Sequence, residues 1–359
     1  MHAFYRIAYC ELRIASYDSH TPPVHTSDFH YDLPEEAIAQ SAVEPRDAAR
    51  LLDTRDMSDH RFRELPSLLR EGDLVVVNRT RVRPARLSGF KEGSGGKVES
   101  LLLRPLGDGS WEALVRPARR LRVGVRIRFG GLVAIVATAP DDGRVILTAD
   151  EGSFDEAIAS VGEVPLPPYF HGRLDDPERY QTIYGDRPGS AAAPTAGLHF
   201  TPEVLASLEA RGIARTAVEL DIGLDTFRPI ATPDLESHPM HRERVRVGDD
   251  AVRAIAAARE RGGRVVAVGT TVVRALESAA AGEGRVEPRE ADTSLFIVPG
   301  YEFSVVDALV TNFHVPASTL VVLIAAFMGE RWRLAYATAL GRGYRFLSFG
   351  DSMLAERAT

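Results

Sequence analysis

The chain has 359 residues, of which 45% are hydrophobic and 26% charged, and its formal net charge is −7. This composition excludes a disordered, collagen-like or disulfide-rich protein. The charge is unevenly distributed, because residues 79–128 contain thirteen Lys and Arg but only four Asp and Glu. A positive segment of this density is typical of surfaces that contact phosphate groups.

Two features of the sequence bear on its cellular location. The only cysteine, Cys10, cannot form an internal disulfide, which favours a reducing compartment. Residues 1–26 lack the continuous apolar segment of a secretory signal, and we expect them to form an N-terminal extension. The most apolar run, 320–328, is far shorter than the ~20 residues that span a bilayer. The sequence therefore predicts a cytoplasmic protein without a membrane partner.

The elements that follow the extension change character twice along the chain. Residues 27–83 include a buried-strand pattern at 73–77. Residues 84–162 then alternate short β-type runs with turn signals, such as 107–109 and 142–143. Successive strands at this spacing, without helices between them, are typical of a small antiparallel barrel.

From residue 163 onward, helical and strand patterns alternate, as in layered α/β folds. The expected strands lie at 213–223, 265–268, 305–310 and 344–349. Residues 27–83 would complete the same domain. The sequence therefore predicts a layered α/β domain, formed by 27–83 and 163–359, that is interrupted by an inserted antiparallel β-barrel domain at 84–162.

Two loops of small and polar residues lie where ligands bind in open α/β folds, at the ends of strands. Residues 194–201 bring His199 to the start of a helix, and residues 269–271 place Thr270 and Thr271 at the start of another. Helix starts offer free amide donors to a carboxylate, a ribose hydroxyl or a phosphate. The alternative interpretations are that His199 packs in the core and that the two threonines act as ordinary helix caps.

Two further polar segments can contribute to a site. Residues 311–316 carry Asn312 and His314 after an expected strand. A second segment carries the pair His238 and His241. A proline separates this pair, and no acidic or cysteine partner completes a recognised ligand set. We therefore expect no metal.

Blocks of sequence along the chain together resemble one protein family. They lie at 46–52, 72–74, 78–82, 84–87, 95–99, 164–169, 180–182, 193–200, 268–278, 299–301, 311–314 and 344–346. In this order they resemble the S-adenosylmethionine:tRNA ribosyltransferase-isomerase family of queuosine biosynthesis, over about residues 28–354. The resemblance implies an α/β domain with an inserted barrel, in a cytoplasmic enzyme that we expect to be a monomer.

The resemblance also implies a reaction between two substrates. The ribosyl part of S-adenosylmethionine would be transferred to 7-aminomethyl-7-deazaguanine in the tRNA anticodon stem-loop and isomerised to give epoxyqueuosine. Adenine and methionine would be released. A general base near the C5′ protons and a proton donor near adenine would serve this chemistry. S-adenosylmethionine acts here as a substrate that carries its own leaving groups, so no metal or redox cofactor is expected.

The positions that match the family's motifs, together with two aspartates of a motif that departs from them, define a candidate site. Candidate catalytic residues are His199, Asp221, Asp225, His241 and His314. Candidate S-adenosylmethionine-binding residues are Thr195, Gly197, Thr226, Gly269, Thr270, Thr271, Arg274, Glu277 and Asn312. Carboxylates that would oppose the sulfonium charge are Asp225, Glu243 and Glu277. Candidate tRNA-binding residues, taken from the positive segment, are Arg79, Arg81, Arg86, Arg116, Arg119, Arg120 and Arg122.

One motif departs from the family pattern. Family members usually read His-Val-Gly-x-Gly-Thr-Phe where this chain has Asp221 in place of the histidine and Asp225 in place of the second glycine. Two added carboxylates would repel tRNA phosphate, yet they suit a sulfonium. Two other functions therefore stay open: a paralogue that performs an elimination or isomerisation on a small molecule, with S-adenosylmethionine as reactant or bound helper, and a catalytically inactive tRNA-binding module.

Overall fold

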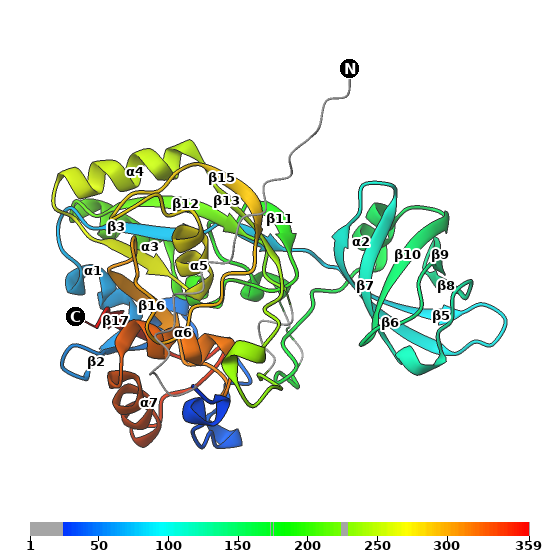
Figure 1. Cartoon of the computed structure of the whole chain (residues 1–359), viewed down its shortest axis with the longest axis horizontal. Coiled ribbons are helices and arrows are strands. Elements are labelled where there is room, and N and C mark those ends of the chain that lie inside the picture. Colours follow the sequence, from blue (N-terminus) through cyan, green and yellow to red (C-terminus); the bar gives the residue numbers. More distant parts are fainter. Residues whose placement is uncertain (1–23, 173, 175, 224–228, 359) are drawn as a thin grey trace.

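The structure is a computed structural model that describes residues 24–172, 174, 176–223 and 229–358. It contains a nine-stranded mixed sheet, a closed six-stranded barrel and a small two-stranded sheet. Helices cover the large sheet, and the barrel lies beside this body (Figure 1). The predicted fold class, a layered α/β structure that contains an antiparallel barrel, is confirmed.

The large sheet has the strand order β15-β13-β12-β3-β14-β16-β17-β1-β2. Its strands are β1 (Arg50–Asp53), β2 (Ser58–Arg61), β3 (Leu74–Asn78), β12 (Ala214–Leu220), β13 (Glu243–Val247), β14 (Val265–Val268), β15 (Arg289–Thr293), β16 (Ala308–Asn312) and β17 (Ser352–Glu356). The four central strands β12, β3, β14 and β16 run parallel to one another. Their carboxyl ends therefore lie along one edge of the sheet.

The central strands are buried on both faces because their side chains alternate between two cores. In β3, Leu74 and Val76 belong to one core, whereas Val75 and Val77 belong to the other. The first core also contains residues of α4 (Asp249–Glu260), α5 (Thr270–Ser278), α6 (Thr319–Met328) and α7 (Arg331–Gly341). The second contains residues of α1 (Leu65–Leu68) and α3 (Pro202–Ala210). The sheet is thus the middle of three layers.

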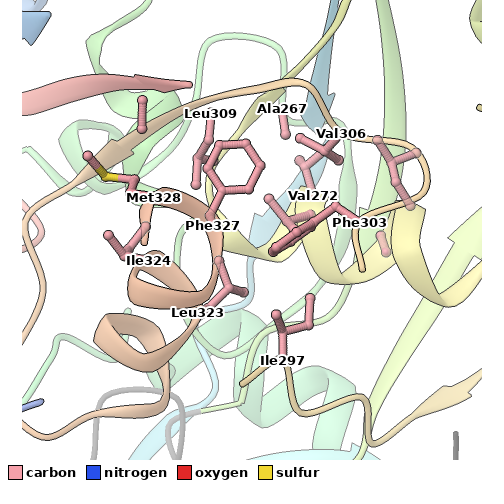
Figure 2. Packing of buried hydrophobic residues seen from close by; sticks show 14 of the residues in the cluster. Ala267, Val272, Ile297, Phe303, Val306, Leu309, Leu323, Ile324, Phe327 and Met328 are labelled. Atoms are coloured by element: carbon pink, nitrogen blue, oxygen red, sulfur yellow. The ribbon is translucent and has the colours of Figure 1, made fainter. Parts of the chain in front are cut away.

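Helix α6 accounts for the most apolar run of the sequence. Its side chains Ile324 and Phe327 pack toward Leu309 of β16, and Val272 of α5 borders the same cluster (Figure 2). The hydroxyl of Ser318 accepts the backbone N–H of Val321 and so caps the start of the helix. No helix within the described residues has the length and apolarity needed to cross a membrane.

The end of the sheet differs from the prediction. Residues 344–349 form a loop, and the last strand is β17, so the predicted strand at 344–349 is wrong. Tyr344 and Phe346 are buried in the core, which gives the loop the apolar pattern of a strand. Leu347 has a φ of 70°, a left-handed conformation that a strand does not contain. The strand predicted at 305–310 is β16, which begins three residues later.

The barrel is an antiparallel closed sheet in the order β10-β7-β6-β5-β8-β9, in which β10 also pairs with β9. Its strands are β5 (Arg86–Lys91), β6 (Lys97–Pro105), β7 (Ser110–Arg116), β8 (Arg126–Phe129), β9 (Leu132–Val136) and β10 (Arg144–Glu151), and helix α2 (Phe154–Val161) follows them. The turn residues predicted at 107–109 and 142–143 connect β6 to β7 and β9 to β10, respectively.

The chain enters and leaves the barrel at neighbouring points. Arg86 and Glu163 exchange backbone hydrogen bonds of 3.0 and 2.9 Å. Beside them, a Cβ atom added to Gly162 would lie only 2.0 Å from the carbonyl oxygen of Pro84. The two connecting segments are visible between the body and the barrel in Figure 1. Nearby, β4 (Thr80–Val82) pairs with β11 (Arg187–Ser190) as a small parallel sheet.

This close approach predicts that Gly162→Ala destabilises the protein. The added methyl group must push the two connecting segments apart, which should lower the free energy of unfolding by about 1–3 kcal/mol. Gly131→Ala is the matched control, because a Cβ atom there meets nothing within 4 Å. Denaturant unfolding of both variants measures the difference, and equal midpoints would contradict the prediction.

Candidate active site

An open cavity of about 560 Å³ lies at the carboxyl ends of the central strands. Its wall includes residues 193–196, residues 269–271 at the start of α5, and residues 311–315 at and beyond the end of β16. Ile222, in the segment that follows β12, borders the same space. Polar loops that are far apart in the sequence therefore meet at the edge where ligands bind in parallel α/β sheets.

Asn312 joins two of these loops and is buried. Its Oδ1 accepts a hydrogen bond of 2.9 Å from the Thr195 hydroxyl. Its Nδ2 lies 3.2 Å from the carbonyl oxygen of Asp351 and 3.3 Å from Nε2 of His199. A carbonyl oxygen can only accept, so Nδ2 is the donor group of the amide. Nε2 of His199 is therefore the acceptor in its contact with Asn312.

His199 is held as a neutral imidazole. Burial lowers its pKa to about 4, and the positive charges of Arg345, Arg179 and Arg46 act in the same direction. A second cavity of about 270 Å³ is lined by His199 together with Arg46, Arg179 and others, and Ser348 borders both cavities. His199 thus lines the second cavity, contacts Asn312 in the wall of the first, and is uncharged at neutral pH.

His314 is the second neutral histidine, and it lies in the wall of the larger cavity. Burial lowers its pKa to about 3. Its ring nitrogens lie 3.2 Å from the Thr311 hydroxyl and 3.2 Å from the Tyr336 hydroxyl. The Tyr31 hydroxyl donates to its backbone oxygen. The orientation of His314 is therefore fixed by groups on several segments.

The start of α5 faces the cavity with its polar groups exposed to it. Gly269 has a φ of 90°, which a residue with a side chain rarely adopts, and precedes the first turn. Thr270 and Thr271 both border the cavity, and no side-chain cap closes the helix. The Oγ1 atom of Thr271 is buried and has no hydrogen-bond partner within the described part of the chain. The alternative interpretation, that these threonines cap the helix, is therefore wrong.

Arg274 lies deeper in α5 and is not among the cavity residues. It forms a buried ion pair with Glu243, whose Oε1 also lies 3.2 Å from Nε2 of His241 and accepts the Gly223 N–H at 3.1 Å. Burial raises the pKa of Glu243, but the Arg274 charge and the His241 contact overcome this and lower it to about 2. The predicted residues Arg274, His241 and Glu243 thus form a network beside the cavity.

Glu277 and Gly197, which were also predicted to bind the ligand, make contacts within the protein instead. The carboxylate of Glu277 accepts the backbone N–H groups of Ser304, Val305 and Val306 at 2.9, 3.0 and 3.0 Å. It therefore holds the segment before β16 and does not border the cavity. A Cβ atom on Gly197 would lie 2.1 Å from the Tyr184 hydroxyl, so this glycine permits close packing.

The structure locates one of the two aspartates that depart from the family motif. Asp225 lies outside the described residues, as does Thr226. The carboxylate of Asp221 lies against Gly189 of β11, since a Cβ atom there would be 2.4 Å from its Oδ1. Burial raises the pKa of Asp221, whereas the nearby Arg83 lowers it. Asp221 is not among the residues that line the cavity, which lies against Ile222 instead.

The seven predicted tRNA-binding arginines fall into two groups. Arg79 pairs with Asp186, Arg81 pairs with Glu178, and the Arg86 Nε lies 3.7 Å from Glu99. The other four lie at the end of β7, in the 3₁₀ turn Ala118–Arg120 and just after it: Arg116, Arg119, Arg120 and Arg122. These four are exposed, and none forms an ion pair with another described residue. They form the barrel arginine cluster.

Five cavity residues escaped the sequence-based prediction, among them Ser318 and Leu320 at the start of α6. Tyr169 and Ser348 line the cavity, and their hydroxyl oxygens are 2.6 Å apart. Leu347 borders the same space. The only sequence signal for Tyr169 was its place in the block 164–169, which carries part of the family resemblance. Leu347 and Ser348 fell in the wrongly predicted strand 344–349, and this assignment concealed their place in the site.

The layered fold, the inserted barrel and the polar cavity at the strand ends have the arrangement typical of α/β enzymes. The family described as "Queuosine biosynthesis protein" matches residues 26–355. The chain belongs to this family. This match and the relatives below agree with the family resemblance found in the sequence.

Similar proteins cover nearly the same length. The chain is 52% identical to the S-adenosylmethionine:tRNA ribosyltransferase-isomerase of Symbiobacterium thermophilum, over 91% of this chain and 98% of that protein. It is 53% identical to the protein of the same name from Heliobacterium modesticaldum, with the same coverage. The crystal structure of S-adenosylmethionine tRNA ribosyltransferase from Thermotoga maritima matches with a TM-score of 0.51 and 38% identity, over 91% of this chain and 99% of that one.

The buried neutral state of His199 predicts a specific pH dependence of stability. Its pKa is about 4 in the folded protein and near 6.5 when unfolded, so between these values only the unfolded chain takes up the proton. Acidification from pH 7 to pH 4.5 should therefore cost the wild type roughly 2–3 kcal/mol more than the variant His199→Gln. Denaturant unfolding at several pH values tests this. A difference in the free energy of unfolding between the two proteins that does not change with pH would contradict it.

Proposed function

We propose that the protein is an S-adenosylmethionine:tRNA ribosyltransferase-isomerase. It transfers the ribosyl part of S-adenosylmethionine to 7-aminomethyl-7-deazaguanine in tRNA, isomerises it to epoxyqueuosine and releases adenine and methionine. The main support is that relatives about half identical in sequence, over nearly their whole length, bear this name. We further propose that it acts in the cytoplasm as a monomer and recognises the anticodon stem-loop.

The cavity offers chemistry that suits this reaction. S-adenosylmethionine would occupy the larger cavity, where hydroxyl and amide groups of Thr195, Thr270 and Asn312 are available to it. The sulfonium makes the neighbouring C5′ protons acidic, so a neutral imidazole can remove one of them. His199 is our candidate for this base because it is neutral and lies directly behind Asn312 in the cavity wall; its Nε2 would act on the substrate after giving up its contact with Asn312. His314 would serve as a proton donor or hydrogen-bonding group within the same wall.

The position of Asp221 favours this function over a small-molecule paralogue. A shift in substrate was suggested by the added negative charge at positions 221 and 225. Asp221, however, lies against Gly189 and near Arg83, and it is not among the residues that line the cavity. It therefore gives no reason to expect that tRNA is repelled from the cavity.

The direct test is the dependence of the reaction on RNA. The protein is incubated with S-adenosylmethionine and an anticodon stem-loop that carries the aminomethyl base, and adenine and methionine are measured. We expect both products only when the modified stem-loop is present, while an unmodified stem-loop serves as the control. Release without RNA would support the small-molecule paralogue, and no release with any RNA would support an inactive binding module.

The barrel arginine cluster should contact RNA phosphates. The double variant Arg119→Gln/Arg120→Gln is expected to raise the KM for the stem-loop. The slope of log binding constant against log salt concentration should become shallower by about 1 for each phosphate that the variant no longer neutralises. Arg126→Gln/Arg128→Gln is the matched control, because both of these arginines already pair with Glu92. An equal reduction of affinity in both variants would assign the effect to net charge rather than to the position of the cluster.

A further inference from the structure

The first turn of α5 carries unused hydrogen-bond donors at the cavity. The backbone N–H of Val272 donates to Gly269 at 3.1 Å, but those of Thr270 and Thr271 have no acceptor within the described residues. The helix is nine residues long, so its aligned peptide dipoles favour negative charge at this end. The two N–H groups belong to residues that line the cavity.

The side chain of Thr271 is a second, independent indication of a ligand. Thr271 is 7% exposed, and its Oγ1 is buried without a hydrogen-bond partner in the described chain. Leaving a buried hydroxyl unpaired is unfavourable. A Cβ atom on Gly269 would lie 3.5 Å from this Oγ1, which places the hydroxyl beside the helix start rather than along the helix. A bound acceptor at the helix start would satisfy it.

Among the described residues, the rest of the cavity wall contains no group that competes for a negative charge. The described residues that line it include no Asp, Glu, Lys or Arg, and the one histidine among them, His314, is neutral. The start of α5 is therefore the most favourable position in this wall for an anion. S-adenosylmethionine contains a single anionic group, the carboxylate of its methionine part.

We propose that the start of α5 binds the carboxylate of S-adenosylmethionine, with the Thr271 hydroxyl and the N–H groups of Thr270 and Thr271 as donors. The proposal rests on the proposed function for the identity of the ligand. It assigns the methionine carboxylate of that ligand to α5, where the sequence had left a carboxylate, a ribose hydroxyl and a phosphate as alternatives. Thr271 is accordingly a binding residue that determines which end of the substrate lies at this helix.

The test compares two ligands that differ in the carboxylate. S-adenosylhomocysteine retains the amino-acid group, and 5′-methylthioadenosine lacks it. Their dissociation constants are measured by calorimetry for the wild type, Thr271→Val and Thr271→Ser. Thr319→Val is the matched control, because Thr319 is also 7% exposed with an unpartnered buried Oγ1 in the first turn of α6, but does not line the cavity.

We expect Thr271→Val to weaken S-adenosylhomocysteine binding roughly ten- to a hundredfold, as for removal of a hydrogen bond to a charged group. Binding of 5′-methylthioadenosine should change less than about twofold, and Thr271→Ser should keep most of the wild-type affinity for both ligands. The melting temperature of Thr271→Val should not fall, because the hydroxyl it removes is unpaired in the free protein. Thr319→Val should leave both affinities unchanged.

Three results would overturn the proposal: equal weakening of both ligands by Thr271→Val, no weakening of either, or wild-type protein that binds S-adenosylhomocysteine no more tightly than 5′-methylthioadenosine. A decrease in stem-loop affinity alone in Thr271→Val would assign the site to an RNA phosphate and would also overturn it. Failure of the proposed function gives a different pattern. In that case the carboxylate preference persists, but adenine release does not depend on the modified RNA.

Discussion

The parallel arrangement of the four central strands is the constraint on which the site depends. These strands are buried on both faces, so their backbone groups are paired within the sheet and cannot serve a ligand. Polar groups are free only where the strands end. Because β3, β12, β14 and β16 end at the same edge, the segments around Thr195, Thr271 and Asn312 come together in one wall.

The charged side chains beside this wall are paired with one another or with backbone N–H groups. Glu243 and Arg274 neutralise each other beside the cavity, and Glu277 is satisfied by three backbone N–H groups. In the described part of the wall, the polar groups are hydroxyls, an amide, backbone donors and the neutral His314, and they lie among apolar side chains. Proton transfer between groups in such a wall does not have to overcome the field of a permanently charged side chain.

Sequence reasoning located the loops of the site but not the direction of every side chain. The buried strands and their polar ends follow from periodicity. Asn312 and His314, which were predicted as site residues from this pattern, line the cavity, and their roles stay predictions. In α5, all positions from Thr270 to Glu277 are buried, so no polar face distinguishes the cavity side from the packing side. The sequence therefore could not show that Thr271 borders the cavity whereas Glu277 does not. Long-range pairs such as Arg79 with Asp186 are likewise invisible in a local count of charges.

Because β1 pairs with β17, the large sheet can be completed only after the end of the chain has been synthesised. Leu51 of β1 lies opposite Ser352 of β17, whereas the turn at 107–109 joins two barrel strands that are adjacent in sequence. Local pairings close faster than distant ones, and synthesis proceeds from the N-terminus. All barrel strands are present on the nascent chain before β12 is made. The cavity needs Asn312 and Ser348, so it comes into existence only near the end of translation, beside barrel strands synthesised long before.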